Sequence, residues 1–293
     1  MIKLAQNLGL IGLATLIAFA ITLVGQTLWG AMAMVNVQLT PAIPWSAVVM
    51  PALLVVLVGV LSGRLGPRTG AEARRGLVPL SPVSGLAWFW SMAGGGAGVI
   101  AAAALWVVLA SLVRVPPNVL PSLAGVPLWT QLAMLLVAIA AAPMTEEIAF
   151  RGYAMGLVRR RFGPIASLLI VSAMFAAAHL TQGLSAPKLL VYFLAGVLFG
   201  FVAWRTGSLL PAMVVHSLGD LTFFALVWRT DAGRRLVSEG GADAGFWTSV
   251  ALVMVFAPLS ILALRQLAKV TAGDAQPRAR RPELDRLSRG LAV

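Results

Sequence analysis

The stretch Val99–Leu109 reads VIAAAALWVVL and contains no charged residue. Similar apolar runs recur along the whole chain, which is 59% hydrophobic and only 11% charged. A soluble domain carries about 25% charged residues, and a helix that crosses a bilayer needs about 20 apolar residues in succession. The runs do not alternate polar and apolar residues as the strands of a membrane barrel would. They therefore predict an all-α protein, a polytopic transmembrane helix bundle.

We expect about eight helical spans, with a polar and basic loop at 63–86 that includes a surface helix. The fourth span is expected to continue past Arg151 toward the cytoplasm. Three successive glycines at 94–96 in the third span allow either close helix packing or a locally weak helix. The expected spans are 8–34, 44–62, 87–113, 127–151, 164–180, 188–204, 209–228 and 246–265.

Three regions follow from this pattern. Residues 1–126 hold the N-terminal transmembrane helices and the basic cytoplasmic loop. Residues 127–230 hold all the clusters of polar residues within apolar runs, and form the expected catalytic core. Residues 231–293 hold the last transmembrane helix and a basic tail, which from Val270 onward is expected to be disordered or to lie on anionic headgroups.

The net charge of +12 is distributed between the spans rather than along one face. With the N-terminus inside, sixteen of the 22 basic residues lie on the inner side and five on the outer side. This bias predicts that both termini are cytoplasmic. No basic face or recognition motif indicates nucleic acid, so the expected partners are the lipid bilayer and a membrane-associated protein or peptide. The Ala-, Gly- and Arg-rich composition favours a bacterial plasma membrane.

The first polar cluster within an apolar run is Glu146, Glu147 and Arg151. Glu147 and Arg151 are four residues apart, so they share a helix face and can form an ion pair. Glu146 is turned about 100° away and stays free, which suits a general base. A solvated salt bridge at a helix end is the alternative interpretation of these three residues.

Both histidines of the chain lie in the other two clusters. His179 ends the run that starts at Phe175, and His216 and Asp220 are again four residues apart. A carboxylate behind an imidazole can fix its tautomer and orientation. Histidines that only join or cap helices are the alternative, but an ionisable group at membrane depth is costly and indicates a functional site.

Two kinds of chemistry fit these residues. One is a site for a divalent metal such as zinc, with Glu146, His179 and His216 or Asp220 as ligands. The other is free of metal: Glu146 and His179 activate water, and His216 helps to stabilise the oxyanion. Either would hydrolyse an amide bond. The chain has no cysteine and no HExxH or GxSxG motif, which excludes thiolate chemistry and the usual zinc-protease and serine-hydrolase signatures.

Three motifs in order carry a resemblance to a known family. EEIAFR at 146–151, FAAAH at 175–179 and HSLGD at 216–220 resemble the EExxxR, FxxxH and Hxxx(N/D) motifs of the CPBP family. This family comprises type II CAAX prenyl endopeptidases and Abi proteins, often labelled metalloproteases. The resemblance covers about 127–230.

The resemblance implies an intramembrane endopeptidase that acts on a CAAX-type, lipidated or other membrane-associated protein. It implies that Glu146 is the base, that His179 is its partner at the water, and that His216 and Asp220 form the oxyanion side. Glu147, Arg151 and Phe175 would support the site. The prenyl-protein proteases have asparagine at the position of Asp220, so Asp220 must be protonated, orient His216 or bind metal.

Two other functions use the same residues. A non-proteolytic immunity or scaffold protein could bind a membrane partner through the same cavity. A proton-coupled transporter would also place Glu and His inside the membrane, although the chain shows no inverted repeat.

Overall fold

The computed structural model describes residues 2–116, 123–227 and 234–273, and these residues form helices and no β-strand. Six helical segments are long and apolar enough to cross a membrane, and a shorter apolar helix, α2 (Trp45–Leu61), accompanies them. The predicted polytopic helix bundle is therefore confirmed, and the chain is an integral membrane protein. The six segments are Lys3–Leu39, Gly85–Leu112, Leu128–Ala178, Ala186–Thr206, Leu210–Val227 and Ala244–Ala272.

The eight expected spans correspond to eight apolar helices, most of them longer than expected. The polar loop contains the expected short helix, α3 (Ala71–Leu77). A helix of four residues, α10 (Val237–Gly240), precedes the last span. The apolar helices are α1 (Ile2–Leu39), α2, α4 (Gly85–Leu112), α5 (Leu128–Glu146), α6 (Met155–Ala178), α7 (Ala186–Thr206), α8 (Leu210–Thr222) and α11 (Ala244–Gly273).

The fourth expected span does continue past Arg151, and it continues much further than the sequence indicates. A π-helix, η1 (Glu147–Ala154), joins α5 directly to α6. The continuous run turns at Gly163, whose φ of 72° and ψ of 179° are not helical. Glycine tolerates this backbone conformation, and Pro164 after it restarts the helix from its first turn.

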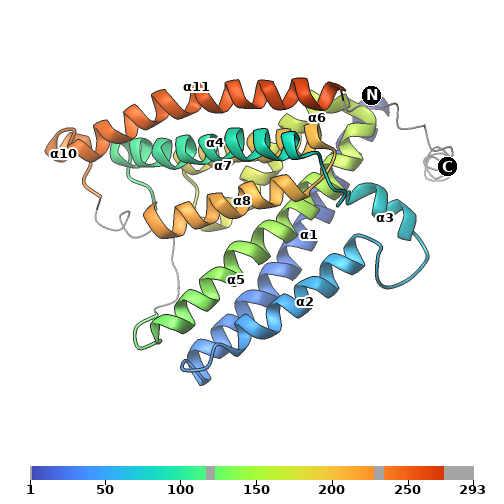
Figure 1. Cartoon of the computed structure of the whole chain (residues 1–293), viewed down its shortest axis with the longest axis horizontal. Coiled ribbons are helices and arrows are strands. Elements are labelled where there is room, and N and C mark those ends of the chain that lie inside the picture. The colour runs from blue at the N-terminus through green and yellow to red at the C-terminus, as the bar shows by residue number, and fades with distance from the viewer. Residues whose placement is uncertain (1, 117–122, 228–233, 274–293) are drawn as a thin grey trace.

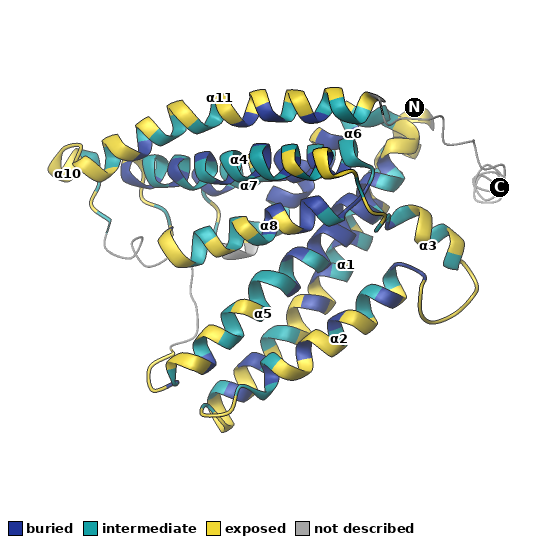
Figure 2. Ribbon diagram, in the orientation of Figure 1, coloured by how far each residue is buried: buried dark blue, intermediate teal, exposed yellow. Residues whose placement is uncertain are grey.

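The helices form two groups that lean apart (Figure 1). Helices α4, α7, α8 and α11 run alongside one another, whereas α1, α2 and α5 form a second group that slants away from them. Buried residues gather where the two groups meet, and the outer faces are largely exposed (Figure 2). Large apolar side chains such as Leu16, Val48 and Met254 lie on these outer faces, as contact with lipid tails requires.

The three glycines at 94–96 differ in role: some allow close helix packing, and one only weakens the helix. A Cβ atom on Gly94 would lie 2.9 Å from Leu264 Cγ, and one on Gly95 would lie 2.6 Å from Val215 Cγ1. Gly96 has nothing within 4 Å of such an atom. Two of the three glycines therefore let α4 approach α11 and α8 closely, and the third only weakens the helix.

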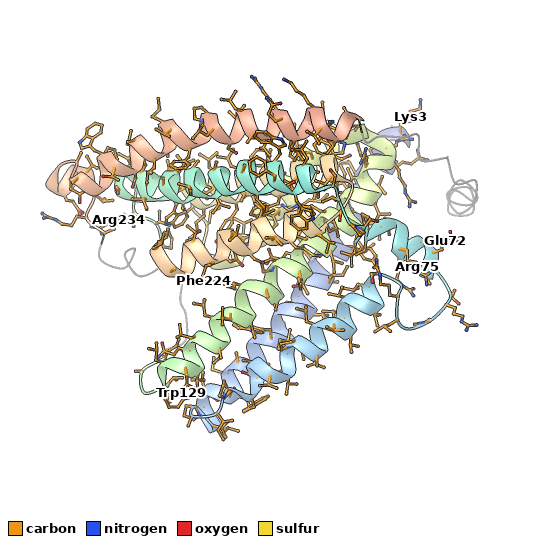
Figure 3. All side chains as sticks on the ribbon, in the orientation of Figure 1. Lys3, Glu72, Arg75, Trp129, Phe224 and Arg234 are labelled. Atoms are coloured by element: carbon orange, nitrogen blue, oxygen red, sulfur yellow. The ribbon has the colours of Figure 1, made fainter. Side chains whose placement is uncertain are left out.

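The start of α1 and the end of α11 lie at the same end of the bundle, the end that also carries α3 (Figure 1). Lys3 and Arg75 are at this end, and Arg234 lies at the far end (Figure 3). The predicted disorder of the tail concerns residues 274–293, which lie outside the described residues.

Candidate active site

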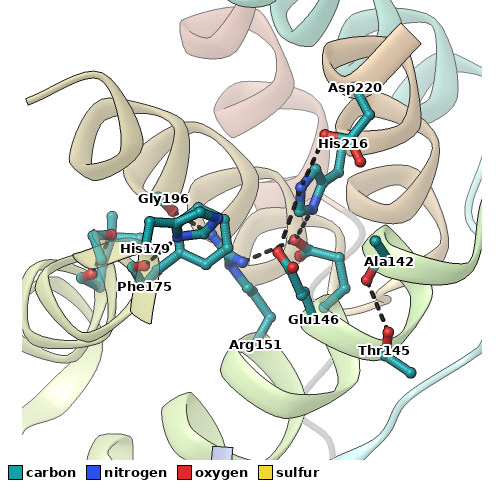
Figure 4. Close-up of polar contacts among 12 residues, drawn as sticks. Ala142, Thr145, Glu146, Arg151, Phe175, His179, Gly196, His216 and Asp220 are labelled. Atoms are coloured by element: carbon teal, nitrogen blue, oxygen red, sulfur yellow. Dashed lines mark hydrogen bonds and ion pairs between the residues drawn. The ribbon is translucent and has the colours of Figure 1, made fainter. Parts of the chain in front are cut away.

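The three predicted polar clusters come together in the region where the two groups of helices meet (Figure 4). Glu146 is the last residue of α5, and the π-helix η1 carries Glu147 and Arg151. His216 and Asp220 come from α8. Single π-helical turns are rare and occur often at functional sites.

The predicted ion pair between Glu147 and Arg151 is confirmed. Arg151 Nη1 donates to Glu147 Oε1 over 2.9 Å, and both side chains are almost fully buried. Arg151 Nη2 donates to the Gly196 carbonyl oxygen over 3.1 Å, which attaches η1 to α7. The guanidinium group also lies over the Phe175 ring, 4.5 Å from its centroid, so Phe175 supports the pair through a cation–π contact.

His216 is oriented by Glu147 rather than by its neighbour on the same helix. The distance from His216 Nδ1 to Glu147 Oε1 is 2.9 Å. A carboxylate only accepts, so Nδ1 carries a proton and donates it, which leaves Nε2 to face the site. The imidazole also stacks on Phe199, with ring centroids 4.3 Å apart. Both contacts restrict the ring to one orientation.

The turn of about 100° between adjacent residues of an α-helix predicts that Glu146 points away from the Glu147–Arg151 pair and stays free. In the structure it is not free. Its Oε1 accepts a hydrogen bond of 2.6 Å from Gln26 Nε2 on α1. Its Oε2 lies 3.7 Å from His216 Nε2. Both glutamates therefore reach one imidazole ring, Glu147 at Nδ1 and Glu146 on the Nε2 side.

Asp220 completes the group around His216. Its Oδ1 lies 3.8 Å from His216 Nε2, which is longer than a hydrogen bond. The side chain is 27% exposed, against 6% for Glu146 and for His216. Asp220 is thus more exposed than Glu146 and Glu147. It lies near His216 Nε2 without forming a hydrogen bond to it.

His179 lies beside this group but does not join it. Its Nδ1 is 2.8 Å from the Phe175 carbonyl oxygen, and its ring stacks on Tyr192 with centroids 3.8 Å apart. The Phe175 ring contacts both imidazole rings. Its centroid lies 4.8 Å from the centroid of the His179 ring and 5.8 Å from that of the His216 ring. Among the described residues, His179 forms no hydrogen bond or ion pair with Glu146.

The described residues do not form the metal site that the sequence allows. Within the described part of the chain, no group of three or more His, Asp or Glu residues is placed to hold a metal ion. In both histidines Nδ1 is engaged, by the Phe175 carbonyl oxygen in His179 and by Glu147 in His216, so Nε2 is the nitrogen that each could offer to a ligand.

Four contributors to the site are absent from the predicted set. Gln26 and Tyr192 had a visible signal, because each is an isolated polar group in an apolar span. Phe199 and the Gly196 carbonyl oxygen had none, because an aromatic side chain and a backbone atom in an apolar helix do not stand out in a sequence.

An apolar groove lies between α5 and α8, the two helices that carry Glu146 and His216. Ser217 in its wall directly follows His216, and Met144 comes two residues before Glu146. The lining residues of the groove are Ile139, Met144, Met213, Val214, Ser217, Leu218 and Leu221.

The fold and this site define an integral membrane protein with buried carboxylates and an oriented imidazole inside its helix bundle. Residues 127–222 match the family model described as type II CAAX prenyl endopeptidase Rce1-like. The resemblance predicted from the three motifs is thereby confirmed over this stretch. The family is a protease family, which supports a peptidase activity for the chain. The searches of curated proteins and of solved structures found no match to the chain.

Proposed function

We propose that the protein is an intramembrane endopeptidase that hydrolyses a peptide bond of a membrane-associated protein or peptide. The observation that carries the proposal is the convergence of Glu146, Glu147 and His216 in a buried site within the stretch 127–222 that matches a protease family. Apolar residues of similar volume often stabilise a fold as well as buried charged residues do, or better. Stability alone therefore does not explain these buried carboxylates.

Glu146 is the general base. Its Oε1 is held by Gln26. Among the described residues its Oε2 accepts no hydrogen bond, because His216 Nε2, at 3.7 Å, is too far away to donate one. The carboxylate takes a proton from a water molecule, whose oxygen attacks the carbonyl carbon of the substrate. Glu147 is assigned a supporting role instead, because its carboxylate neutralises Arg151 and holds His216 in place.

His216 stabilises the oxyanion that forms on the substrate. Glu147 holds its Nδ1–H, so Nε2 is directed at the space between Glu146 and Asp220. An N–H at Nε2 would donate to the oxyanion, and the carboxylate of Asp220 stabilises the protonated ring at 3.8 Å. This role of Asp220 avoids the problem that an ionised aspartate cannot donate a hydrogen bond itself.

The tetrahedral intermediate then collapses. The C–N bond breaks, and Glu146 returns its proton to the leaving amine, so the carboxylate is regenerated and one water is consumed per bond. His179 has Nε2 as its free nitrogen, because Nδ1 is directed at the Phe175 carbonyl oxygen. We assign Nε2 of His179 to the attacking water, as the partner of Glu146.

The substrate reaches the site from the membrane. The groove between α5 and α8 is lined mainly by apolar side chains of the two helices that carry Glu146 and His216, which suits a lipidated or hydrophobic segment of the substrate. The basic residues at the end of the bundle near the termini favour a cytoplasmic location for that end. The scissile bond would then lie near the cytoplasmic leaflet.

The test is peptide cleavage by the purified protein in detergent, with products read by mass spectrometry. The peptides are a mixed library of lipidated and unmodified sequences, incubated with and without chelator. Glu146→Gln keeps the side-chain volume and removes the base, so cleavage should disappear while the thermal unfolding midpoint is maintained. Turnover in that variant would contradict the role of Glu146.

The other outcomes separate the alternatives. Cleavage that continues in chelator supports the metal-free route. Loss of cleavage in chelator, restored by added zinc, would overturn that route but keep the endopeptidase. No cleavage by the wild type would favour a binding protein, or a transporter if the protein moves protons in sealed vesicles.

A further inference from the structure

Gln26 lies far outside the stretch that matches the protease family, yet it contacts the proposed base. Helix α1 is apolar around it, and the Gln26 side chain is exposed on the surface of the bundle. An amide group facing lipid without a hydrogen bond is unfavourable, so a glutamine at such a position needs a partner. That partner is Glu146.

The contact with Gln26 engages one of the two carboxylate oxygens of Glu146. Gln26 Nε2 donates to Glu146 Oε1 over 2.6 Å. The amide nitrogen must be the donor, because a carboxylate oxygen can only accept. With Oε1 engaged, Oε2 is the oxygen that approaches His216 Nε2 at 3.7 Å.

A glycine next to Gln26 makes the contact possible. A Cβ atom on Gly25 would lie 2.7 Å from Thr145 Cγ2, so only glycine allows α1 to approach α5 this closely. Thr145 directly precedes Glu146. The close approach of Gly25 to Thr145 therefore places the next residue of each helix, Gln26 and Glu146, within hydrogen-bond distance.

We infer that Gln26 is a positioning residue: it orients the Glu146 carboxylate so that Oε2 faces the reacting water and His216. This inference rests on the proposed proteolytic function. It extends the catalytic machinery to the first helix, which the family match at 127–222 does not include.

The first test compares cleavage kinetics of Gln26→Leu and Gln26→Asn with the wild type. Loss of the orienting amide should lower kcat by about 10-fold or more and leave KM unchanged, since substrate binding does not involve it. Asn keeps an amide that is one methylene too short to reach, so it should show a similar loss. Gln266→Leu on α11 is the matched control, an exposed glutamine remote from the site.

An unchanged kcat in Gln26→Leu, or full activity in Gln26→Asn, would overturn the inference. A change in KM alone would also overturn it, because it would assign Gln26 to substrate binding.

The second test needs no substrate and uses the absence of cysteine from the chain. In the double variant Gly25→Cys/Thr145→Cys the two Cβ atoms would lie 3.2 Å apart before any adjustment. A separation a few tenths of an ångström larger brings them to the roughly 3.5 Å at which disulfides form. Oxidation should cross-link α1 to α5. The control pair is Gly30→Cys/Thr145→Cys, because Gly30 has nothing within 4 Å of an added Cβ atom.

The two tests fail separately. Absence of the Gly25–Thr145 cross-link would remove the helix contact and the inference with it, whether or not the protein is a protease. Formation of the cross-link together with no cleavage by the wild type would instead contradict the proposed function, and the assignment of Gln26 within it.

Discussion

Glu147 connects the functional side chains at the scale of single residues. One of its oxygens, Oε1, accepts from both Arg151 and His216, so a single carboxylate balances a guanidinium and fixes an imidazole. Its other oxygen, Oε2, is buried without a hydrogen-bond partner in the described structure. This concentration of charge makes the site sensitive to the loss of any one partner.

The first residue-scale prediction concerns Arg151. Arg151→Ala leaves the fully buried Glu147 without its cation, and breaking a buried pair in this way costs about 3–5 kcal/mol. We expect a lower folded yield and a lower thermal unfolding midpoint in detergent. Arg160→Ala, at an exposed position on the same continuous helix, is the control and should behave as the wild type. Equal stability of the two variants would show that the pair does not support the fold.

At the scale of helices, the glycines of α4 provide an adjacent matched pair. Gly95→Ala introduces a methyl group against the branched side chain of Val215, the residue before His216. Overpacking of this kind costs about 1–3 kcal/mol and would displace α8 with its imidazole. We expect a lower unfolding midpoint and reduced cleavage.

Gly96→Ala is the control for that prediction, because nothing lies within 4 Å of the added atom. Replacing a helical glycine by alanine there should stabilise the protein by about 0.5–1 kcal/mol. The measurement is thermal unfolding of both variants in the same detergent. A more stable Gly95→Ala would contradict the close packing of α4 on α8.

The connection between α5 and α6 is also decided at this scale. The π-helix η1 follows α5 without interruption and carries both members of the ion pair. The i, i+4 spacing predicts the Glu147–Arg151 contact correctly. The sequence offers no sign that the helix widens there, or that Glu146 and Glu147 both reach His216.

For the whole molecule, the distribution of basic residues predicts that both termini face the cytoplasm. Single cysteines test this directly in a chain that has none. Thr69→Cys lies in the exposed loop before α3, and Ala242→Cys in the exposed segment before α11. In intact cells, a membrane-impermeant maleimide should label Ala242→Cys only. Labelling of Thr69→Cys without permeabilisation would reverse the orientation.

The sequence by itself determined the features that depend on local pattern. Runs of apolar residues long enough to cross a bilayer predicted the helix bundle, because span length is a property of a single segment. Ionisable residues inside those runs marked one site, because burying charge in a membrane is costly. Its members are Glu146, Glu147, Arg151, His179, His216 and Asp220. The Glu147–Arg151 pair followed from the helical repeat alone.

Only the tertiary structure decided which partners complete the site. Gln26 and Glu146 are 120 residues apart, Glu147 and His216 are 69 apart, and Arg151 and the Gly196 carbonyl oxygen are 45 apart. Such contacts depend on how helices pack, and packing depends on glycines such as Gly25 whose neighbours are distant in sequence. No local pattern encodes those distances, because the period of a helix specifies the face of a residue and not what lies against it.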